Sequence, residues 1–304
     1  MGMNVDLNGL TLKNPIIAAS GTYGYNNEFE VFCDITKLGA IVTKAITLHP
    51  RPGNDWQRIF EAPCGLINSI GLENVGIEKY ISSLRANGEA IQLIVNIAGS
   101  TAEEYIDLAT ICHRQGIKAI ELNLSCPNVE HGCLEFGTEA EALYELVSRV
   151  REVYSGHLTA KLTPNVTSIE KIAIAAQKAG ANAISAINTV KALGLKLTYI
   201  NGEFKKEHVR GGLSGKAIKP IALGAVERIS KVVSIPIIGM GGIYDLEDVL
   251  AFFAVGAQAV QVGTANFTHP DTCEKLVNEL GSFMQTHGFA TLDELKKALR
   301  KEKI

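Results

Sequence analysis

The sequence IPIIGMGGIYDLEDVLAFFAVGAQAVQVGT, residues 235–264, contains two apolar runs with an amphipathic helical pattern between them. The runs 236–239 and 259–262 are apolar at nearly every position, as in parallel strands that are buried on both faces. The helical pattern 246–254 follows Asp245, a residue type that commonly caps helices, and ends shortly before Gly256. This stretch therefore predicts a strand, a helix and a second strand.

The same unit recurs along the rest of the chain. Strands are predicted at residues 15–19, 40–44, 91–95, 119–123, 158–162, 183–187, 236–239 and 259–262, with helical patterns between them, clearest at 102–114, 139–153, 168–179, 219–232 and 246–254. Eight such units favour the α/β class and a (β/α)8 TIM barrel, with residues 1–304 as a single domain. A doubly wound open sheet is the alternative, but no GxGxxG sequence follows the first strand.

Composition excludes several classes of protein. The 304 residues carry a net charge of −3, whereas nucleic-acid-binding domains are usually basic. No apolar run approaches the ~18 residues that span a membrane, and the N-terminus lacks the pattern of a signal peptide. The six cysteines form no CxxC pair, which argues against a zinc or disulfide framework. We expect a cytoplasmic protein that binds no metal, nucleic acid or membrane.

Long connections follow three of the predicted strands. Residues 47–73 follow strand two, 127–137 follow strand four and 189–215 follow strand six. In the third connection, Asn201-Gly202 lies between two short β-type runs and predicts a type I′ hairpin. Long loops in compact domains are usually functional, and these lie on the face where TIM barrels place their active sites.

Polar residues and glycines gather at the carboxyl ends of all eight predicted strands. Glycines end strands seven and eight together, which favours phosphate binding through backbone N–H groups. Lys44 and Lys161 end strands two and five, and each could form a Schiff base, stabilise an anion, bind phosphate or make a structural salt bridge. The remaining strand-end residues are Ser20-Gly21, Asn96, Asn123, Asn188-Thr189, Gly241-Gly242 and Gly263-Thr264.

Cys126 lies in the segment NLSCPN, residues 123–128, directly after strand four. A lone cysteine is more often a small buried apolar residue than a catalyst. The polar neighbours and the loop position nevertheless make a reactive thiol plausible, and a thiol can serve as an acid or base near neutral pH. We expect structural roles for Cys33, Cys64, Cys112 and Cys273.

Taken in order, these motifs resemble the family 1 dihydroorotate dehydrogenases, flavin-dependent barrels of pyrimidine biosynthesis. The resemblance extends from about residue 7 to residue 267. The matching stretches are LKNPIIAASGTYGY, VTKAIT, RPGN, INSIGLENVG, VNIAGS, ELNLSCPNV, FGT, KLTPNV, INTV, GGLSGKAIKP, IPIIGMGGI and VQVGTANF.

The resemblance implies one bound FMN and a substrate, dihydroorotate, on the flavin face. Cys126 would take the proton from C5 while hydride leaves C6, and Lys161 would lie against the N1/O2 edge of the flavin. The FMN phosphate would lie on Gly241, Gly242, Gly263 and Thr264, near Gly215. The rest of FMN would contact Ser20, Lys44, Ala45, Asn96, Asn123, Lys161 and Ile187. The substrate would contact Lys44, Asn68, Ser69, Ile70, Gly71, Leu72, Asn123, Asn128, Asn188 and Thr189.

Within family 1, several of these motifs resemble subtype 1B, the NAD-linked catalytic subunit, more than subtype 1A. That subtype implies a homodimeric core within a heterotetramer, with a partner subunit that carries FAD and a [2Fe–2S] cluster. The chain itself has neither a dinucleotide fingerprint nor a cysteine cluster, so NAD chemistry would occur on the partner. Two details depart from the usual pattern: Asp55-Trp56 stands where prolines are expected, and Cys133 stands where glycine is common.

Three alternatives remain at this stage. The fumarate-dependent subtype 1A would be a homodimer without a partner subunit. A phosphosugar aldolase or isomerase would use Lys161 in a Schiff base. A barrel without catalytic activity would bind FMN as a sensor.

Overall fold

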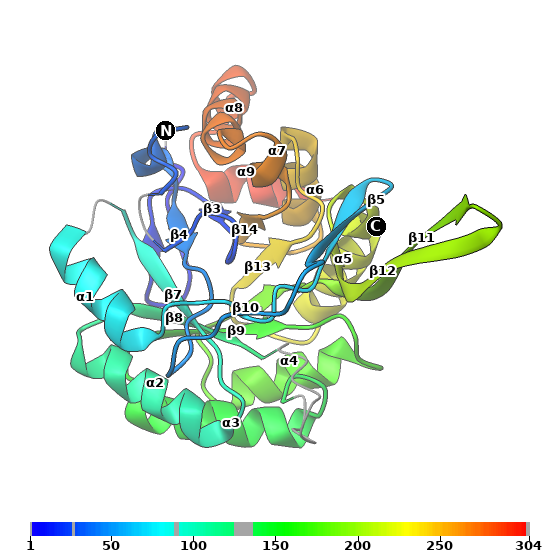
Figure 1. The fold of residues 1–304 in the computed structure, drawn as a ribbon. Coiled ribbons are helices and arrows are strands. Elements are labelled where there is room, and N and C mark those ends of the chain that lie inside the picture. The colour runs from blue at the N-terminus through cyan, green and yellow to red at the C-terminus, as the bar shows by residue number, and fades with distance from the viewer. Residues whose placement is uncertain (1, 26–27, 88–90, 125–135, 302–304) are drawn as a thin grey trace.

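A computed structural model of the chain describes residues 2–25, 28–87, 91–124 and 136–301. Eight strands form a closed barrel in which spatial order follows chain order and every neighbouring pair is parallel (Figure 1). The strands are β3 (Ile16–Ala18), β4 (Ala40–Val42), β7 (Leu93–Ile97), β8 (Ala119–Asn123), β9 (His157–Leu162), β10 (Ala183–Ala186), β13 (Ile237–Met240) and β14 (Ala259–Val262). The predicted TIM barrel and its eight strands are confirmed.

Helices surround the barrel, and α2, α4, α5, α6 and α8 pack an apolar face on its strands. They are α1 (Ile77–Asn87), α2 (Ala102–Arg114), α3 (Ala140–Val153), α4 (Ile169–Lys178), α5 (Lys219–Ser230), α6 (Leu246–Ala254), α7 (Ala265–Thr268), α8 (Thr272–Thr286) and α9 (Leu292–Leu299). Asp245 caps α6 as expected, and Asp248 completes a capping box by bonding back to the backbone of Asp245.

The first β-then-α unit differs from the expected pattern. The described residues between β3 and β4 contain the short 3-10 helix η1 (Ile35–Lys37) in place of an α-helix. The outer side of β3 is instead covered by α8, which packs against both β3 and η1 from the other end of the chain. The sequence pattern missed this exchange because the covering helix lies more than 230 residues away from the strand it covers.

A second sheet stands at the carboxyl end of the barrel, where the loops after strands two and six were predicted. Its antiparallel order is β11 (Val190–Ile200), β12 (Glu203–Ser214), β6 (Gly65–Asn68) and β5 (Ile59–Ala62). Asn201 and Gly202 join β11 to β12 with φ of 51° and 87°, which confirms the predicted type I′ turn. The sequence did not predict that these two connections pair with each other, through β6 and β12.

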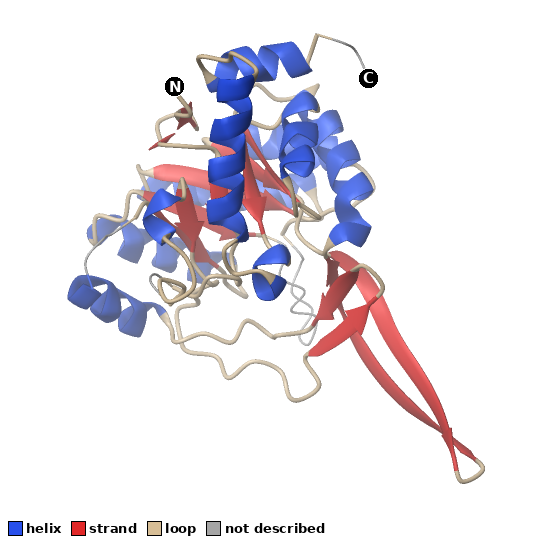
Figure 2. Cartoon of the chain, turned by 90° about the horizontal axis from the view of Figure 1, so that it is seen from above, coloured by secondary structure: helices blue, strands red, loops and turns tan. Residues whose placement is uncertain are grey.

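The β11–β12 hairpin extends well away from the barrel (Figures 1 and 2). Its outer part contacts solvent on both faces, and Leu193, Leu195, Leu197 and Tyr199 of β11 are all about half exposed. At the opposite end of the barrel, β1 (Val5–Asp6) pairs with β2 (Thr11–Leu12). Among the described residues, no helix has both the length and the apolar composition needed to cross a membrane.

Candidate active site

Most of the predicted site residues lie at the carboxyl ends of the barrel strands. Asn96, Asn123 and Lys161 belong to β7, β8 and β9, and Ser20, Lys44 and Asn188 each follow a strand by two residues. Because these ends of parallel strands meet at one mouth, the barrel brings residues from separate parts of the chain together. Cys126 and Asn128 lie outside the described residues, so their predicted roles remain predictions.

Asn123 and Asn188 are in direct contact. Nδ2 of Asn188 donates a hydrogen bond to Oδ1 of Asn123 over 3.3 Å, and both side chains are partly exposed to the mouth. Oδ1 of Asn188 in turn accepts from the backbone N–H of Thr189 at 2.8 Å. The carbonyl of Thr189 accepts a further hydrogen bond from Asn165 at 3.1 Å. The two amides are therefore oriented toward each other by the protein itself.

Lys44 contacts a carboxylate that the sequence interpretation did not include. Its Nζ lies 3.6 Å from Oε2 of Glu73, and the same oxygen accepts from Nη1 of Arg58 at 3.0 Å. Both lysine and glutamate are partly exposed, at 31% and 47% of their side-chain surface. One of the alternatives for Lys44, a salt bridge, is therefore present in this structure.

Residues 68–72 begin at Asn68, the last residue of β6, and continue beyond that strand. Asn68 donates from Nδ2 to the carbonyl of Gly212 at 3.2 Å, and Asn54 donates from its backbone to the carbonyl of Ile70 at 3.0 Å. Gly71 and Leu72 have φ of 75° and 54°, so the backbone makes a sharp turn here. Glycine adopts this conformation without strain, whereas leucine rarely does.

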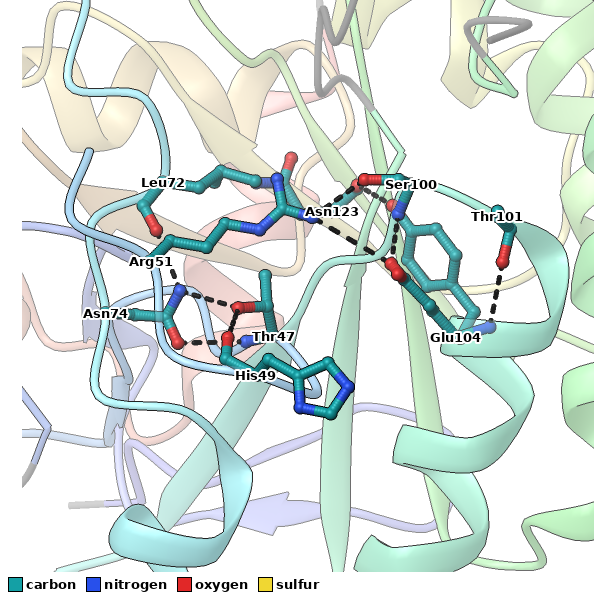
Figure 3. Close-up of polar contacts among 10 residues, drawn as sticks. Thr47, His49, Arg51, Leu72, Asn74, Ser100, Thr101, Glu104 and Asn123 are labelled. Carbon is teal, nitrogen blue, oxygen red and sulfur yellow. Dashed lines mark hydrogen bonds and ion pairs between the residues drawn. The ribbon is translucent and has the colours of Figure 1, made fainter. Parts of the chain in front are cut away.

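Two polar clusters hold this segment and its surroundings in place (Figure 3). Asn74 bridges the segment to the end of strand two: its Nδ2 donates to Oγ1 of Thr47 at 2.8 Å and to the carbonyl of Leu72 at 2.7 Å. Arg51 donates to Oγ of Ser100 at 2.7 Å and lies 3.9 Å from the carboxylate of Glu104. Neither cluster was found from the sequence, since the Asn74–Thr47 and Arg51–Ser100 bonds join residues 27 and 49 positions apart.

The structure requires glycine at the end of strand seven but not at the end of strand eight. Gly241 and Gly242 have φ of 120° and 77°, and a Cβ on Gly242 would lie 2.6 Å from Cβ of Lys219. The backbone conformation and the close packing both require glycine there. A Cβ on Gly263 would meet nothing closer than Ala19 at 3.8 Å, so the packing does not require glycine at that position. Gly215 (φ 99°) precedes the 3-10 helix η2 (Lys216–Ile218).

Three of the remaining predicted contacts, Ala45, Asn96 and Ile187, are buried. Ala45 and Ile187 are 7% and 2% exposed, and Thr264 lies directly before α7. Asn96 is fully buried, and its Oδ1 has no hydrogen-bond partner among the described residues. An unpaired buried acceptor is costly, so an unmatched Oδ1 is a feature that a bound molecule with a donor group would satisfy.

Lys161 points into the barrel and has a fully buried partner, Glu121. Its Nζ lies 3.8 Å from Oε1 of Glu121, and the lysine is 6% exposed. The same carboxylate accepts hydrogen bonds from Asn96, Ser185 and Gln261. Sequence reasoning passed over Glu121 because it lies within an apolar strand, although a charged residue in such a run is itself an unusual signal.

The described cysteines divide into two groups. Burial raises the pKa of the Cys112 and Cys273 thiols to about 12, so both remain protonated and unreactive near neutral pH. Burial also raises the pKa of Cys33. These three fit the predicted structural role. Cys64 does not, since it is exposed in the turn between β5 and β6. No group of three or more His, Cys, Asp or Glu within the described ranges is placed to hold a metal ion.

Sequence comparison agrees with the geometry of this mouth. The family profile described as dihydroorotate dehydrogenase matches residues 2–284. A protein of Bacteroides thetaiotaomicron is 42% identical over 98% of both chains, and one of Bacillus cytotoxicus is 46% identical over 96% of this chain and 95% of its own. A third, from Caldicellulosiruptor saccharolyticus, is 44% identical over 97% of this chain and 98% of its own. All three are named dihydroorotate dehydrogenase B (NAD(+)), catalytic subunit. With the barrel and its ring of polar strand ends, this similarity shows that the chain belongs to the dihydroorotate dehydrogenase family.

Proposed function

We propose that this chain oxidises dihydroorotate to orotate in pyrimidine biosynthesis, as the catalytic subunit of an NAD-linked enzyme. The observation that carries the proposal is the contact between Asn123 and Asn188 at the mouth of a barrel that belongs to this family. Asparagine offers donors and an acceptor, which suits a ring that itself presents N–H and C=O groups.

The residues at the mouth fit FMN. Lys161 supplies a cation at the carboxyl end of β9, and Oδ1 of Asn96 is a buried acceptor without a donor among the described residues. Gly241 and Gly242 bring backbone close to α5, and Gly263 leaves room for a ligand beside Ala19. When bound, FMN supplies the acceptor for the hydride that leaves C6 of dihydroorotate.

The chain's own residues have three tasks in this proposal. Cys126 takes the proton from C5 of dihydroorotate, so that loss of one proton and one hydride leaves the C5=C6 double bond of orotate. Asn123, Asn188 and Thr189 hold the ring, together with Asn68 and Asn128. Lys44 pairs with the substrate carboxylate after separating from Glu73. The ion pair that Lys44 now makes is partly exposed, so its exchange for another carboxylate costs little.

We propose that the electrons pass from this chain to NAD⁺ through a partner subunit. The names of the relatives specify a catalytic subunit and NAD(+), which supports a separate subunit for electron transfer. We propose that this subunit carries FAD and a [2Fe–2S] cluster. We propose a homodimeric core of this chain with one such subunit on each copy, in the cytoplasm. The row of half-exposed apolar side chains on β11 supports an assembly, because such rows commonly mark interfaces.

The test is to purify the chain alone and identify its bound flavin after denaturation. We expect FMN, orotate formation from dihydroorotate with an artificial dye, and no NAD⁺ reduction until the partner subunit is added. A chain without flavin, or with no turnover of dihydroorotate with any acceptor, would contradict the proposed function. Efficient turnover with fumarate by the chain alone would contradict the NAD-linked subtype and leave the chemistry intact.

A further inference from the structure

We infer that Glu121 is a positioning residue that sets the charge at the flavin site by acting through Lys161 and Asn96. The inference rests on the proposed function, because it concerns the FMN that Lys161 and Asn96 would contact. Glu121 itself lies deeper in the barrel, on β8, and is fully buried.

Glu121 is the centre of a hydrogen-bond cluster that joins five barrel strands. Oε1 accepts from Nδ2 of Asn96 on β7 at 2.7 Å and lies 3.8 Å from Nζ of Lys161 on β9. Oε2 accepts from Oγ of Ser185 on β10 at 2.8 Å and from Nε2 of Gln261 on β14 at 2.7 Å. Every described contact of the carboxylate is with a donor, and both of its oxygens act as acceptors.

The carboxylate fixes the orientation of the two amides around it. Oδ1 of Asn96 and Oε1 of Gln261 are both buried without a partner among the described residues. Turning either amide over would place its oxygen against a carboxylate oxygen, which is repulsive. Glu121 therefore makes Asn96 present its acceptor, and only its acceptor, away from the cluster.

The same carboxylate balances the charge of Lys161. A buried ammonium group needs a counter-charge, and Glu121 is within ion-pair distance of it. Lys161 and Glu121 together carry no net charge. The positive charge of Lys161 at the flavin site is therefore partly offset by the negative charge of Glu121, which lies deeper in the barrel. Reduction of a flavin places negative charge at N1 and O2, and nearby cations favour it whereas nearby anions oppose it.

This balance predicts the sign of the effect of removing the negative charge. Glu121→Gln keeps the size of the side chain and the ability to accept a hydrogen bond, but leaves Lys161 without its counter-charge. We expect the reduction potential of bound FMN to become more positive. Sulfite adds to flavin N5 and leaves negative charge at N1/O2, so its dissociation constant should fall about tenfold. The matched control is Glu141→Gln, the same change at an exposed position on α3, which lies outside the barrel.

A second variant keeps the test decisive if Glu121→Gln does not fold. Gln261→Leu removes one donor from the carboxylate without changing formal charge, so the negative charge is less well neutralised. It should shift the potential and the sulfite affinity in the opposite direction.

The inference would be overturned if Glu121→Gln bound FMN with unchanged or more negative potential and unchanged sulfite affinity, or if Gln261→Leu raised the potential. These results are distinguishable from failure of the proposed function, in which the unmodified chain would bind no FMN or would not be reduced by dihydroorotate.

Discussion

Nδ2 of Asn188 donates a hydrogen bond to Oδ1 of Asn123 over 3.3 Å, although 65 residues separate the two along the chain. The barrel places the ends of β8 and β10 close enough for this contact, with β9 between them. The pair is thus ordered before any ligand binds, which lowers the entropic cost of binding a ring that hydrogen-bonds to both amides.

Replacing one amide of this pair should weaken ligand binding more than folding. We expect Asn188→Ala to bind orotate about tenfold more weakly, the effect of losing roughly 1.4 kcal/mol of hydrogen bonding in a largely preformed site. FMN content should be unchanged. Titration of the flavin spectrum with orotate measures this. Equal affinity in Asn188→Ala and the unmodified chain would remove Asn188 from the substrate site.

Cys126 is predicted to be the base, and its replacement should separate binding from chemistry. We expect Cys126→Ala to retain FMN and bind orotate, yet to reduce the flavin ~10²–10⁴-fold more slowly with dihydroorotate. Cys126→Ser should keep a little activity that increases at high pH, because a hydroxyl is a weaker acid than a thiol. Rapid-mixing measurements under anaerobic conditions give both rates. Near-normal reduction in the alanine variant would exclude Cys126 as the base.

Glu73 competes with the substrate carboxylate for Lys44 in the proposed mechanism. Removing its charge with Glu73→Gln should tighten orotate binding by up to about fivefold, because exposed ion pairs contribute about 0–1 kcal/mol. The difference should shrink at high ionic strength. Glu61→Gln, an exposed change on neighbouring β5, is the matched control. Weaker orotate binding by Glu73→Gln at low salt would show that Glu73 supports the site instead of competing.

His157 should make folding sensitive to acid. Burial lowers the pKa of His157 to about 4, below its ordinary value of 6.5, so the unfolded chain takes up a proton before the folded one does. The neutral imidazole contributes fully to the free energy of unfolding above pH 6.5, and this contribution is lost as pH falls toward 4. The total loss is about 3 kcal/mol.

Urea denaturation at several pH values measures this effect. The free energy of unfolding of His157→Gln should fall less than that of the unmodified chain between pH 6.5 and 4. The exposed His208→Gln variant should behave like the unmodified chain. Parallel curves for the unmodified chain and His157→Gln would contradict the assigned role of His157.

The barrel strands could be predicted from the sequence because each is a short, continuous run of apolar residues. The runs 119–123 and 259–262 match β8 and β14 in full, and Gly116, Gly180 and Gly256 lie where helices end, with φ of 72°, 96° and 119°. These features depend on a few neighbouring residues, so the sequence pattern alone is informative.

The pairing of the β11–β12 hairpin with β6 and the Glu121 cluster could not be predicted in this way. Strand β6 is four residues long, and it pairs with β12 through Asn68 and Gly212, which are 144 residues apart. Glu121 lies in an apolar run and acquires its partners only when the barrel closes around it. Both features depend on long-range contacts, which single-sequence patterns do not contain.

The central claim is that dihydroorotate reduces a flavin held at the mouth of this barrel. The most direct measurement is an anaerobic titration of the purified, FMN-loaded chain with dihydroorotate, followed by flavin absorbance and by the orotate formed. We predict bleaching of the flavin with about one orotate formed per FMN reduced. Flavin that stays oxidised at saturating dihydroorotate, with no orotate formed, would contradict the account.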